Sequence, residues 1–247
     1  MSESTDLTAV QAGDNQVSLP STNRALPQPE VVKTRFGMFG ASLGEDTTGF
    51  SGLVQKFALP GETERPYGSW FDEVVDIIEE LIESDGLKVA DVIERVVVQH
   101  DQLTLWIRRE HLPRVAQWLR DDQDLRFEMC LGVTGVNYPE DEGRELHGYY
   151  AFRSFTHKRT IFIESTCPDA DPHLPSLAHI YPGIDWHERE AWDLMGIVFD
   201  GHPALTRIAL PQEWVGHPQR KDYPLGGIPV QYRGATTPPA DSRRSYN

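Results

Sequence analysis

The feature that most constrains the fold is a succession of helical and strand periods between residues 70 and 165. Residues 70–84 carry apolar side chains at helical spacing, whereas 92–99 and 103–108 are strand-like and are joined by a tight turn. A second helix over 110–120 and strands over 125–136, 146–155 and 159–165 follow. The order α-β-β-α-β-β-β predicts a two-layer α+β domain, in which helices cover one face of a mixed sheet.

The segments that flank this domain differ from it in composition and lack its hydrophobic periodicity. Residues 1–30 are polar and aperiodic, which predicts disorder, and 36–52 alternate glycine with Phe36, Phe39 and Phe50. We expect the latter segment to be either a flexible extension or an arm that docks on a partner.

After residue 165 the sequence contains prolines at short intervals. It predicts a short helix over 176–180, a stronger helix over 185–195 and, because of the prolines beyond 196, no long helix afterwards. Residues 66–180 contain 11 basic and 22 acidic residues, whereas 181–247 contain 7 and 8. A nearly neutral, aromatic-rich tail is suited to lying on another protein.

We therefore expect three parts. Residues 1–65 form a disordered or partner-docking extension, 66–196 form the globular domain, and 197–247 form an extended tail that wraps a partner subunit.

Composition excludes several functional classes. The net charge of −15 argues against nucleic acid and anionic lipid as partners. No apolar stretch is long enough to span a bilayer, and the N-terminus lacks the features of a signal peptide, so we expect a soluble cytoplasmic chain. Cys130 and Cys167 form no CxxC pair, and neither a dinucleotide fingerprint nor a phosphate loop is present. We expect no metal and no cofactor in this chain.

The densest group of reactive side chains lies on the predicted helix 185–195. His187, Glu190 and Asp193 fall on one helical face, and with His202 they suggest a metal site. A zincin motif would need a second histidine at position 191, which is alanine. We therefore expect not a metal site but an ionic network with arginines of this chain or of a partner. Its acidic and basic members are Glu188, Arg189, Glu190 and Asp193, with Arg207, Arg220 and Lys221 as candidate cations.

A short motif is repeated downstream. Gly-His-Pro occurs at 201–203 and again at 216–218, where glycine and proline favour fixed turns. The run 187–225 combines these turns with the charged helix. Its most distinctive positions are Glu188, Arg189, Glu190, Asp193, Leu194, Gly196, Ile197, His202, Arg207, Ile208, Leu210, Pro211, Trp214, His217, Arg220, Lys221, Asp222, Tyr223 and Pro224.

This run strongly resembles the signature of the 30 kDa subunit family (the C subunits) of proton-translocating NADH–quinone oxidoreductase, respiratory complex I. The predicted element order of 70–165 also resembles that family's globular domain. Ala209 and Gln219 depart from the usual larger aliphatic residue and leucine, respectively, and leave the polar signature intact.

The resemblance implies a non-catalytic scaffold subunit of the peripheral arm, inactive in isolation, on the cytoplasmic side of the cell membrane. FMN, iron–sulfur clusters, NADH and quinone would belong to the complex. The partners would be other complex I subunits, chiefly the hydrogenase-like D subunit and then the B and I subunits. The residues expected at the partner interface or in the structural signature are Glu188, Arg189, Glu190, Asp193, His202, Arg207, Trp214, His217, Arg220, Lys221, Asp222 and Tyr223.

Two other functions compete with this one. The first is the equivalent subunit of a related membrane-bound hydrogenase or formate-lyase-type complex. A fusion to a hydrogenase-like region is frequent there, and the chain ends at Asn247 without one. The second is a free-standing metal-dependent enzyme built on His187, Glu190 and His202.

Overall fold

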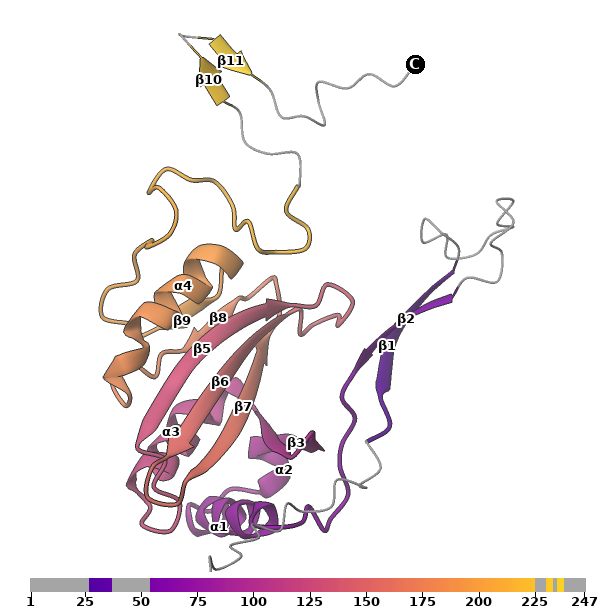
Figure 1. The fold of residues 1–247 in the computed structure, drawn as a ribbon, viewed down its shortest axis with the longest axis vertical. Helices are drawn as coiled ribbons and strands as arrows, with labels where there is room; N and C mark the ends of the chain where they lie inside the picture. Colours follow the sequence, from indigo (N-terminus) through magenta and orange to yellow (C-terminus); the bar gives the residue numbers. More distant parts are fainter. Residues whose placement is uncertain (1–26, 37–53, 225–229, 233–234, 238–247) are drawn as a thin grey trace, which may run out of the picture.

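A five-stranded mixed sheet forms the centre of the protein (Figure 1). The computed structural model describes residues 27–36, 54–224, 230–232 and 235–237. The strand order is β3-β4-β7-β6-β5, with β4 parallel to β7 and the other neighbours antiparallel. The strands are β3 (Ile93–Gln99), β4 (Gln102–Ile107), β5 (Met129–Asn137), β6 (Leu146–Ser154) and β7 (Arg159–Cys167). The predicted two-layer α+β domain with a mixed sheet is confirmed.

The helices α1 (Phe71–Ser84), α3 (Leu112–Asp121) and α4 (Asp185–Met195) lie on one face of this sheet. Gly135 of β5 and Gly148 of β6 are register partners and therefore share a face. A Cβ atom at Gly135 would touch Met195 of α4, so α4 covers that face at the β5 edge. Tyr181, which follows β7 in the chain, belongs to the same layer. Its hydroxyl donates to the Phe127 carbonyl at 2.8 Å and lies 3.3 Å from the Ala116 carbonyl in α3.

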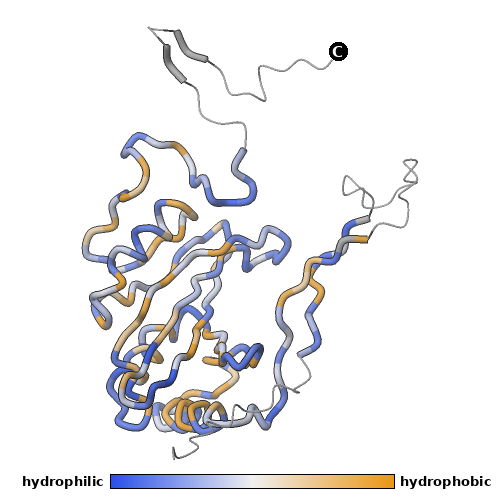
Figure 2. The backbone as a smooth tube through the Cα atoms, viewed as in Figure 1, coloured by the Kyte–Doolittle hydropathy of each residue, from blue (hydrophilic) through white to orange (hydrophobic). Residues whose placement is uncertain are grey.

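The core lies between the helices and the sheet. Every second residue of the central strands points into it, including Leu105, Tyr150 and Ile163, each at most 1% exposed. The apolar face of α1, which includes Val74 and Ile78, packs against the core side of the sheet. Figure 2 shows this concentration of hydrophobic residues along α1 and the strands. A short helix, α2 (Val89–Val92), and a 3-10 turn, η1 (Arg109–His111), connect the elements.

A β-hairpin packs on the opposite face. Its strands β1 (Glu30–Phe36) and β2 (Val54–Leu59) pair antiparallel. Leu59 and Val32 pack against Val97 and Trp106 of the sheet. These two strands are ordered, although they lie in the stretch 1–65 that we expected to be a disordered or partner-docking extension. The expected disorder of 1–26 and the expected arm carrying Phe39 and Phe50 lie outside the described residues.

The region around α4 also differs from expectation. Residues 176–180 form turns, with Ile180 N–H bonded to the Leu177 carbonyl, instead of the predicted short helix. They lead into the 3-10 turn η2 (Pro182–Ile184). The strands β8 (His173–Pro175) and β9 (Val198–Asp200) pair in parallel on either side of α4 in the chain.

Residues 201–224 contain no helix, as the prolines predict, and no strand. Further on, β10 (Val230–Tyr232) and β11 (Ala235–Thr237) pair antiparallel, and the rest of the tail beyond 224 lies outside the described residues. In the part of the chain that the structure describes, no helix is both long and apolar enough to cross a membrane.

Candidate functional site

Helix α4 directs two carboxylates into the protein. Its buried residues are Glu188, Ala191 and Asp193, and both acidic side chains are 0% exposed. The helix ends at Gly196, whose left-handed φ of 81° is strained for any residue with a Cβ atom. The chain then turns back over the helix and meets Asp193.

Asp193 binds three consecutive backbone N–H groups. Its Oδ2 accepts from Ile208 at 3.1 Å, Ala209 at 2.9 Å and Leu210 at 3.0 Å. Its Oδ1 accepts from Arg207 Nη1 at 2.5 Å. Burial alone would raise the pKa of Asp193, but these four donors lower the pKa below its ordinary value. The result is a buried anion with all of its charge compensated inside the chain.

Further bonds tie the same loop to the end of α4. Arg207 Nη2 donates to the Trp214 carbonyl at 2.9 Å, and His217 Nδ1 bonds to the Asp193 carbonyl at 3.0 Å. We call Asp193, Arg207 and His217, together with the backbone of 208–214, the Asp193 clamp. The clamp folds a segment that has no secondary structure of its own onto α4.

The segment beyond the clamp stays attached to the domain. The Gln219 N–H donates to the Leu194 carbonyl at 3.1 Å, and the Lys221 N–H to Asn137 Oδ1 of β5 at 2.9 Å. Arg220 pairs with Asp169 in the loop after β7. Residues 201–224 are therefore held along α4 and β5 by contacts within the chain.

Glu188 occupies a second buried site. It accepts from Ser176 Oγ at 2.5 Å and from the Leu177 N–H at 2.7 Å. Burial raises the pKa of Glu188 to about 7 in spite of these two donors. Glu188 fixes the turn that replaces the predicted helix at 176–180.

The two Gly-His-Pro turns have different roles. His202 Nδ1 accepts from the Ala204 N–H at 3.1 Å, while its Nε2 lies 3.3 Å from Asp185 Oδ1, so its ring stabilises the turn before the clamp. His217 belongs to the clamp itself. Within the described ranges, no group of three or more His, Cys, Asp or Glu side chains is placed to hold a metal ion. His187, proposed as a metal ligand together with His202, lies instead against Gly132 of β5.

The structure separates residues that the sequence grouped together. We expected Glu188, Arg189, Glu190 and Asp193 to form an ionic network with arginines of this chain or of a partner. Asp193 pairs with Arg207 of this chain, one of the candidate cations, whereas Glu188 bonds to Ser176 and Leu177. Arg189 donates to Thr206 Oγ1 at 2.7 Å and stacks on Trp186. Glu190 is exposed and has no ion pair within the described residues.

The remaining signature residues lie on the surface side of the clamp. Trp214 and Tyr223 are half-buried, and the Tyr223 ring lies beside Gly216. Asp222 is exposed and pairs with Arg220. The partners that the sequence did not reveal are Ser176, Thr206, Asn137 and Asp169. A serine or an asparagine far away in the chain carries no spacing signal that would link it to α4.

Gly196→Ala should loosen the clamp. The new Cβ would lie 2.6 Å from His217 Cδ2, so the ring would have to move and lose its bond to Asp193. We expect a loss of about 2 kcal/mol in the free energy of unfolding, from backbone strain and one hydrogen bond. Gly86→Ala is the matched control, because Gly86 has a φ of 78° and open space around it. Equal losses in urea denaturation of the two variants would contradict the role of His217.

Comparisons with known proteins agree with the signature. Residues 105–229 match the family described as respiratory-chain NADH dehydrogenase, 30 Kd subunit. The chain is 58% identical over 221 residues to the C subunit of the NADH-quinone oxidoreductase of Mycobacterium tuberculosis strain H37Rv, covering 90% of this chain and 94% of the relative. It is 59% identical over 218 residues to the protein of the same name from Mycobacterium avium strain 104, covering 88% and 93%.

A solved structure, the trypsin-resistant fragment (1–134) of Nqo5, matches with a TM-score of 0.43 and 21% identity, covering 53% of this chain and 98% of the fragment. By the family match and by the two mycobacterial relatives, which the chain resembles over nearly its whole length, the chain belongs to the 30 kDa subunit family of the respiratory-chain NADH dehydrogenase, the family of the NADH-quinone oxidoreductase C subunits.

Proposed function

We propose that this subunit is a scaffold of the peripheral arm of complex I and holds no redox centre of its own. FMN, the iron–sulfur clusters, NADH and quinone belong to the other subunits. Both cysteines support this role, because burial raises the pKa of Cys130 and of Cys167 to about 12. A protonated, buried thiol is a poor metal ligand and a poor nucleophile.

The observation that carries the proposal is the Asp193 clamp. It gives an otherwise irregular segment a fixed shape on the outside of α4, and it leaves apolar side chains in solvent. Val215 is 86% exposed and Trp186 is 63% exposed. A preformed loop binds with a smaller loss of conformational entropy than a disordered one. Such a surface suits permanent contact with another subunit.

The partner we propose for this surface is chiefly the hydrogenase-like D subunit, followed by the B and I subunits. Glu190 is the signature carboxylate left exposed on α4, one helical turn from Trp186, and we include it in the contact. Through these contacts the chain would lie on the cytoplasmic side of the cell membrane, peripheral to it and attached through the complex.

Val215→Asp and Trp186→Asp should each lower the amount of chain that assembles into the complex. A charge placed in a buried apolar contact of this kind is expected to cost about 2 kcal/mol or more, which is about a 30-fold weaker association. The measurement is the yield of tagged chain that co-purifies with the hydrogenase-like partner from detergent-solubilised membranes, relative to total tagged chain.

Phe155→Asp is the matched control for Trp186→Asp. Phe155 is 60% exposed and lies at the β6–β7 turn. Thermal unfolding of the three isolated variants should differ little, since the substituted side chains are largely in solvent. Normal co-purification of the Val215 and Trp186 variants would rule out this surface as the main attachment.

A further inference from the structure

The β1–β2 hairpin is anchored in the body of the protein at one end, which we call its base (residues 30–32 and 58–60). Arg95 of β3 secures the base, because its Nη1 donates to Glu30 Oε2 at 2.6 Å and to the Pro60 carbonyl at 3.2 Å. Its guanidinium lies 4.2 Å from the centroid of the Trp106 ring, against which Leu59 of the hairpin packs. The Arg95 side chain is 10% exposed, so added salt screens this contact only weakly.

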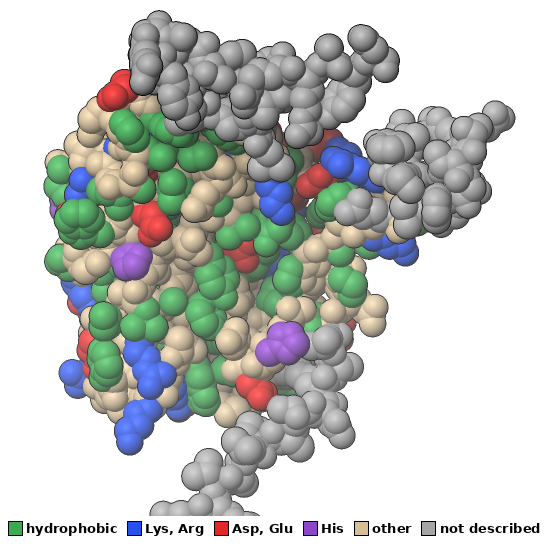
Figure 3. Space-filling view, turned by 45° about the horizontal axis from the view of Figure 1, so that its top comes forward, with side chains coloured by type: hydrophobic (Ala, Val, Ile, Leu, Met, Phe, Trp, Pro, Cys, Tyr) green, Lys and Arg blue, Asp and Glu red, His purple; other side chains and the backbone are tan. Residues whose placement is uncertain are grey.

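The rest of the hairpin, which we call the strap (residues 33–36 and 54–57), reaches the body through exposed ion pairs. Arg35 Nη2 lies 2.8 Å from Glu140 Oε1, and Lys33 Nζ lies 3.7 Å from Glu142 Oε1. The two cationic side chains are 43% and 40% exposed, respectively. Figure 3 shows acidic and basic side chains next to each other where the hairpin meets the body. Within the described residues no backbone–backbone hydrogen bond joins the strap to the body, so these weak, salt-sensitive pairs are its principal polar attachment.

A β-bulge separates the base from the strap. Val31 pairs with Ala58 and Lys33 pairs with Phe57, so Val32 has no partner and the register shifts at this point. A bulge interrupts the ladder of backbone hydrogen bonds and bends the bulged strand. The bulge is therefore the point at which the strap can swing while β1 and β2 stay paired on either side of it.

The loop that faces the strap, residues 138–145 between β5 and β6, is closely tied to the sheet. The Tyr138 N–H donates to the Glu145 carbonyl at 2.8 Å, and Arg144 Nη2 donates to Asp141 Oδ1 at 3.1 Å. The Tyr138 ring also meets the ring of His147 edge-on, with 4.7 Å between their centroids. Because these contacts fix the loop, a change in the distance between loop and strap would come from the strap.

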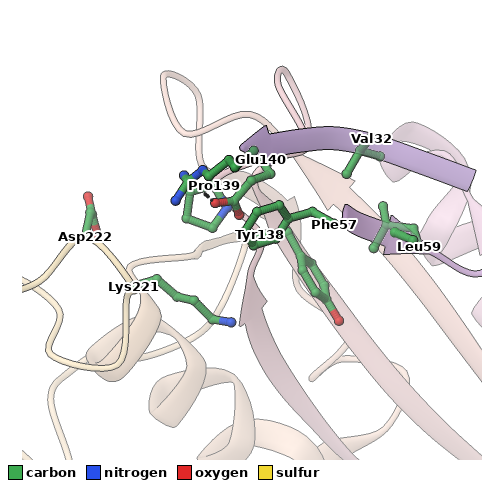
Figure 4. A pocket seen from close by; sticks show the side chains of 10 residues that line it. Val32, Phe57, Leu59, Tyr138, Pro139, Glu140, Lys221 and Asp222 are labelled. Atoms are coloured by element: carbon green, nitrogen blue, oxygen red, sulfur yellow. Dashed lines mark hydrogen bonds and ion pairs between the residues drawn. The ribbon is translucent and has the colours of Figure 1, made fainter. Parts of the chain in front are cut away.

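A cavity of about 530 Å³ lies between the strap and this loop. Arg35 and Phe57 line it from the strap, and Tyr138 and Glu140 line it from the loop. Figure 4 shows Phe57, Tyr138 and Glu140 around this space. We propose that the strap is a hinged, salt-sensitive arm, which swings at the Val32 bulge and opens or closes the cavity while the base stays attached. Opening breaks the two ion pairs. The arm is a property of the free chain, so this inference does not depend on the proposed function.

Distances between two spin labels on the purified full chain test the hinge, and the two native cysteines are buried and stay unlabelled. One label is placed at Ala170, an exposed residue beside Asp169, whose N–H donates to Glu145 of the loop. The second is placed either at Thr34 on the strap or at Gln28 just before the base, both of which are exposed. Between about 50 mM and about 500 mM NaCl, the ratio of long to short Thr34–Ala170 distances should rise about fivefold as the ion pairs are screened. The Gln28–Ala170 distances should stay the same.

Arg35→Gln separates the loss of an ion pair from a general effect of salt. It should raise the ratio of long to short Thr34–Ala170 distances about threefold at low salt. Lys56→Gln is the matched control and should leave the ratio unchanged, because Lys56 is exposed on β2 and has no ion pair within the described residues. Equal ratios for Arg35→Gln and wild type, or Thr34 distances that do not respond to salt, would overturn the proposal. Equal changes at Thr34 and Gln28 would overturn it too, because the hairpin would then leave the body as one piece instead of bending at the bulge.

Discussion

Asp193→Ala is expected to release residues 206–217 from α4 and to lower the free energy of unfolding by about 3–5 kcal/mol. The substitution leaves the Arg207 guanidinium, which is 11% exposed, without its carboxylate. It also leaves the N–H groups of 208–210 without their acceptor, so nothing holds this segment on α4. Urea denaturation of the isolated chain measures the loss, and limited proteolysis locates the released segment.

Glu190→Ala provides the comparison on the same helix. Glu190 is exposed and forms no ion pair within the described residues, so its removal should change the free energy of unfolding by no more than about 0.5 kcal/mol. Its effect is expected instead on the amount of assembled complex, with unchanged turnover for each complex that assembles. Equal destabilisation by the two substitutions would refute the clamp.

The periodic elements of the domain could be predicted from the sequence because each carries its own signal. Helix α1 buries Val74, Val75 and Ile78 at helical spacing, and β6 and β7 alternate buried with half-buried residues. The prediction was poorest at the start of β5, placed at residue 125 although the strand begins at Met129. Residues 122–127 form a turn there, in which Asp122 Oδ1 accepts from the backbone of Leu125.

Elements defined by distant pairing could not be predicted in this way. The strands β8 and β9 have three residues each and pair across α4, so neither contains a recognisable period. In the hairpin, β1 has an irregularity between Val31 and Lys33 that disturbs its alternation. Pairing between segments so far apart in the chain leaves no local trace in the sequence.

The direction of the α4 carboxylates was equally hidden. A helical projection places Glu190 and Asp193 on one face, yet Asp193 points inward and Glu190 points to solvent, and Glu188 is buried as well. Buried carboxylates are expected next to cations, and Arg207 was a reasonable candidate for that role. The three N–H groups that complete the site of Asp193 belong to the backbone, and the sequence gives no sign of where they converge.

Glu188→Gln is expected to remove most of the pH dependence of stability near neutral pH. Burial raises the pKa of Glu188 to about 7 in the folded chain, from an ordinary value of 4.5. A group whose pKa is raised by folding stabilises the fold fully below its unfolded pKa, and this contribution is lost as the pH rises through the folded value. Between pH 4 and pH 8 the loss amounts to about 3 kcal/mol, because each pKa unit corresponds to about 1.4 kcal/mol.

The glutamine variant keeps the shape of the site without the ionisation. Its amide oxygen can accept from the Leu177 N–H, and its amide nitrogen can donate to Ser176 Oγ. Wild type should therefore lose stability relative to Glu188→Gln as the pH rises, and the difference should level off above pH 8.

Glu190→Gln controls for removing a charge from α4, and its stability curve should run parallel to that of wild type because Glu190 is in solvent. Urea midpoints at half-unit pH intervals provide the curves. Parallel curves for wild type and Glu188→Gln would mean that Glu188 stays ionised in the core, held by its bonds from Ser176 and Leu177.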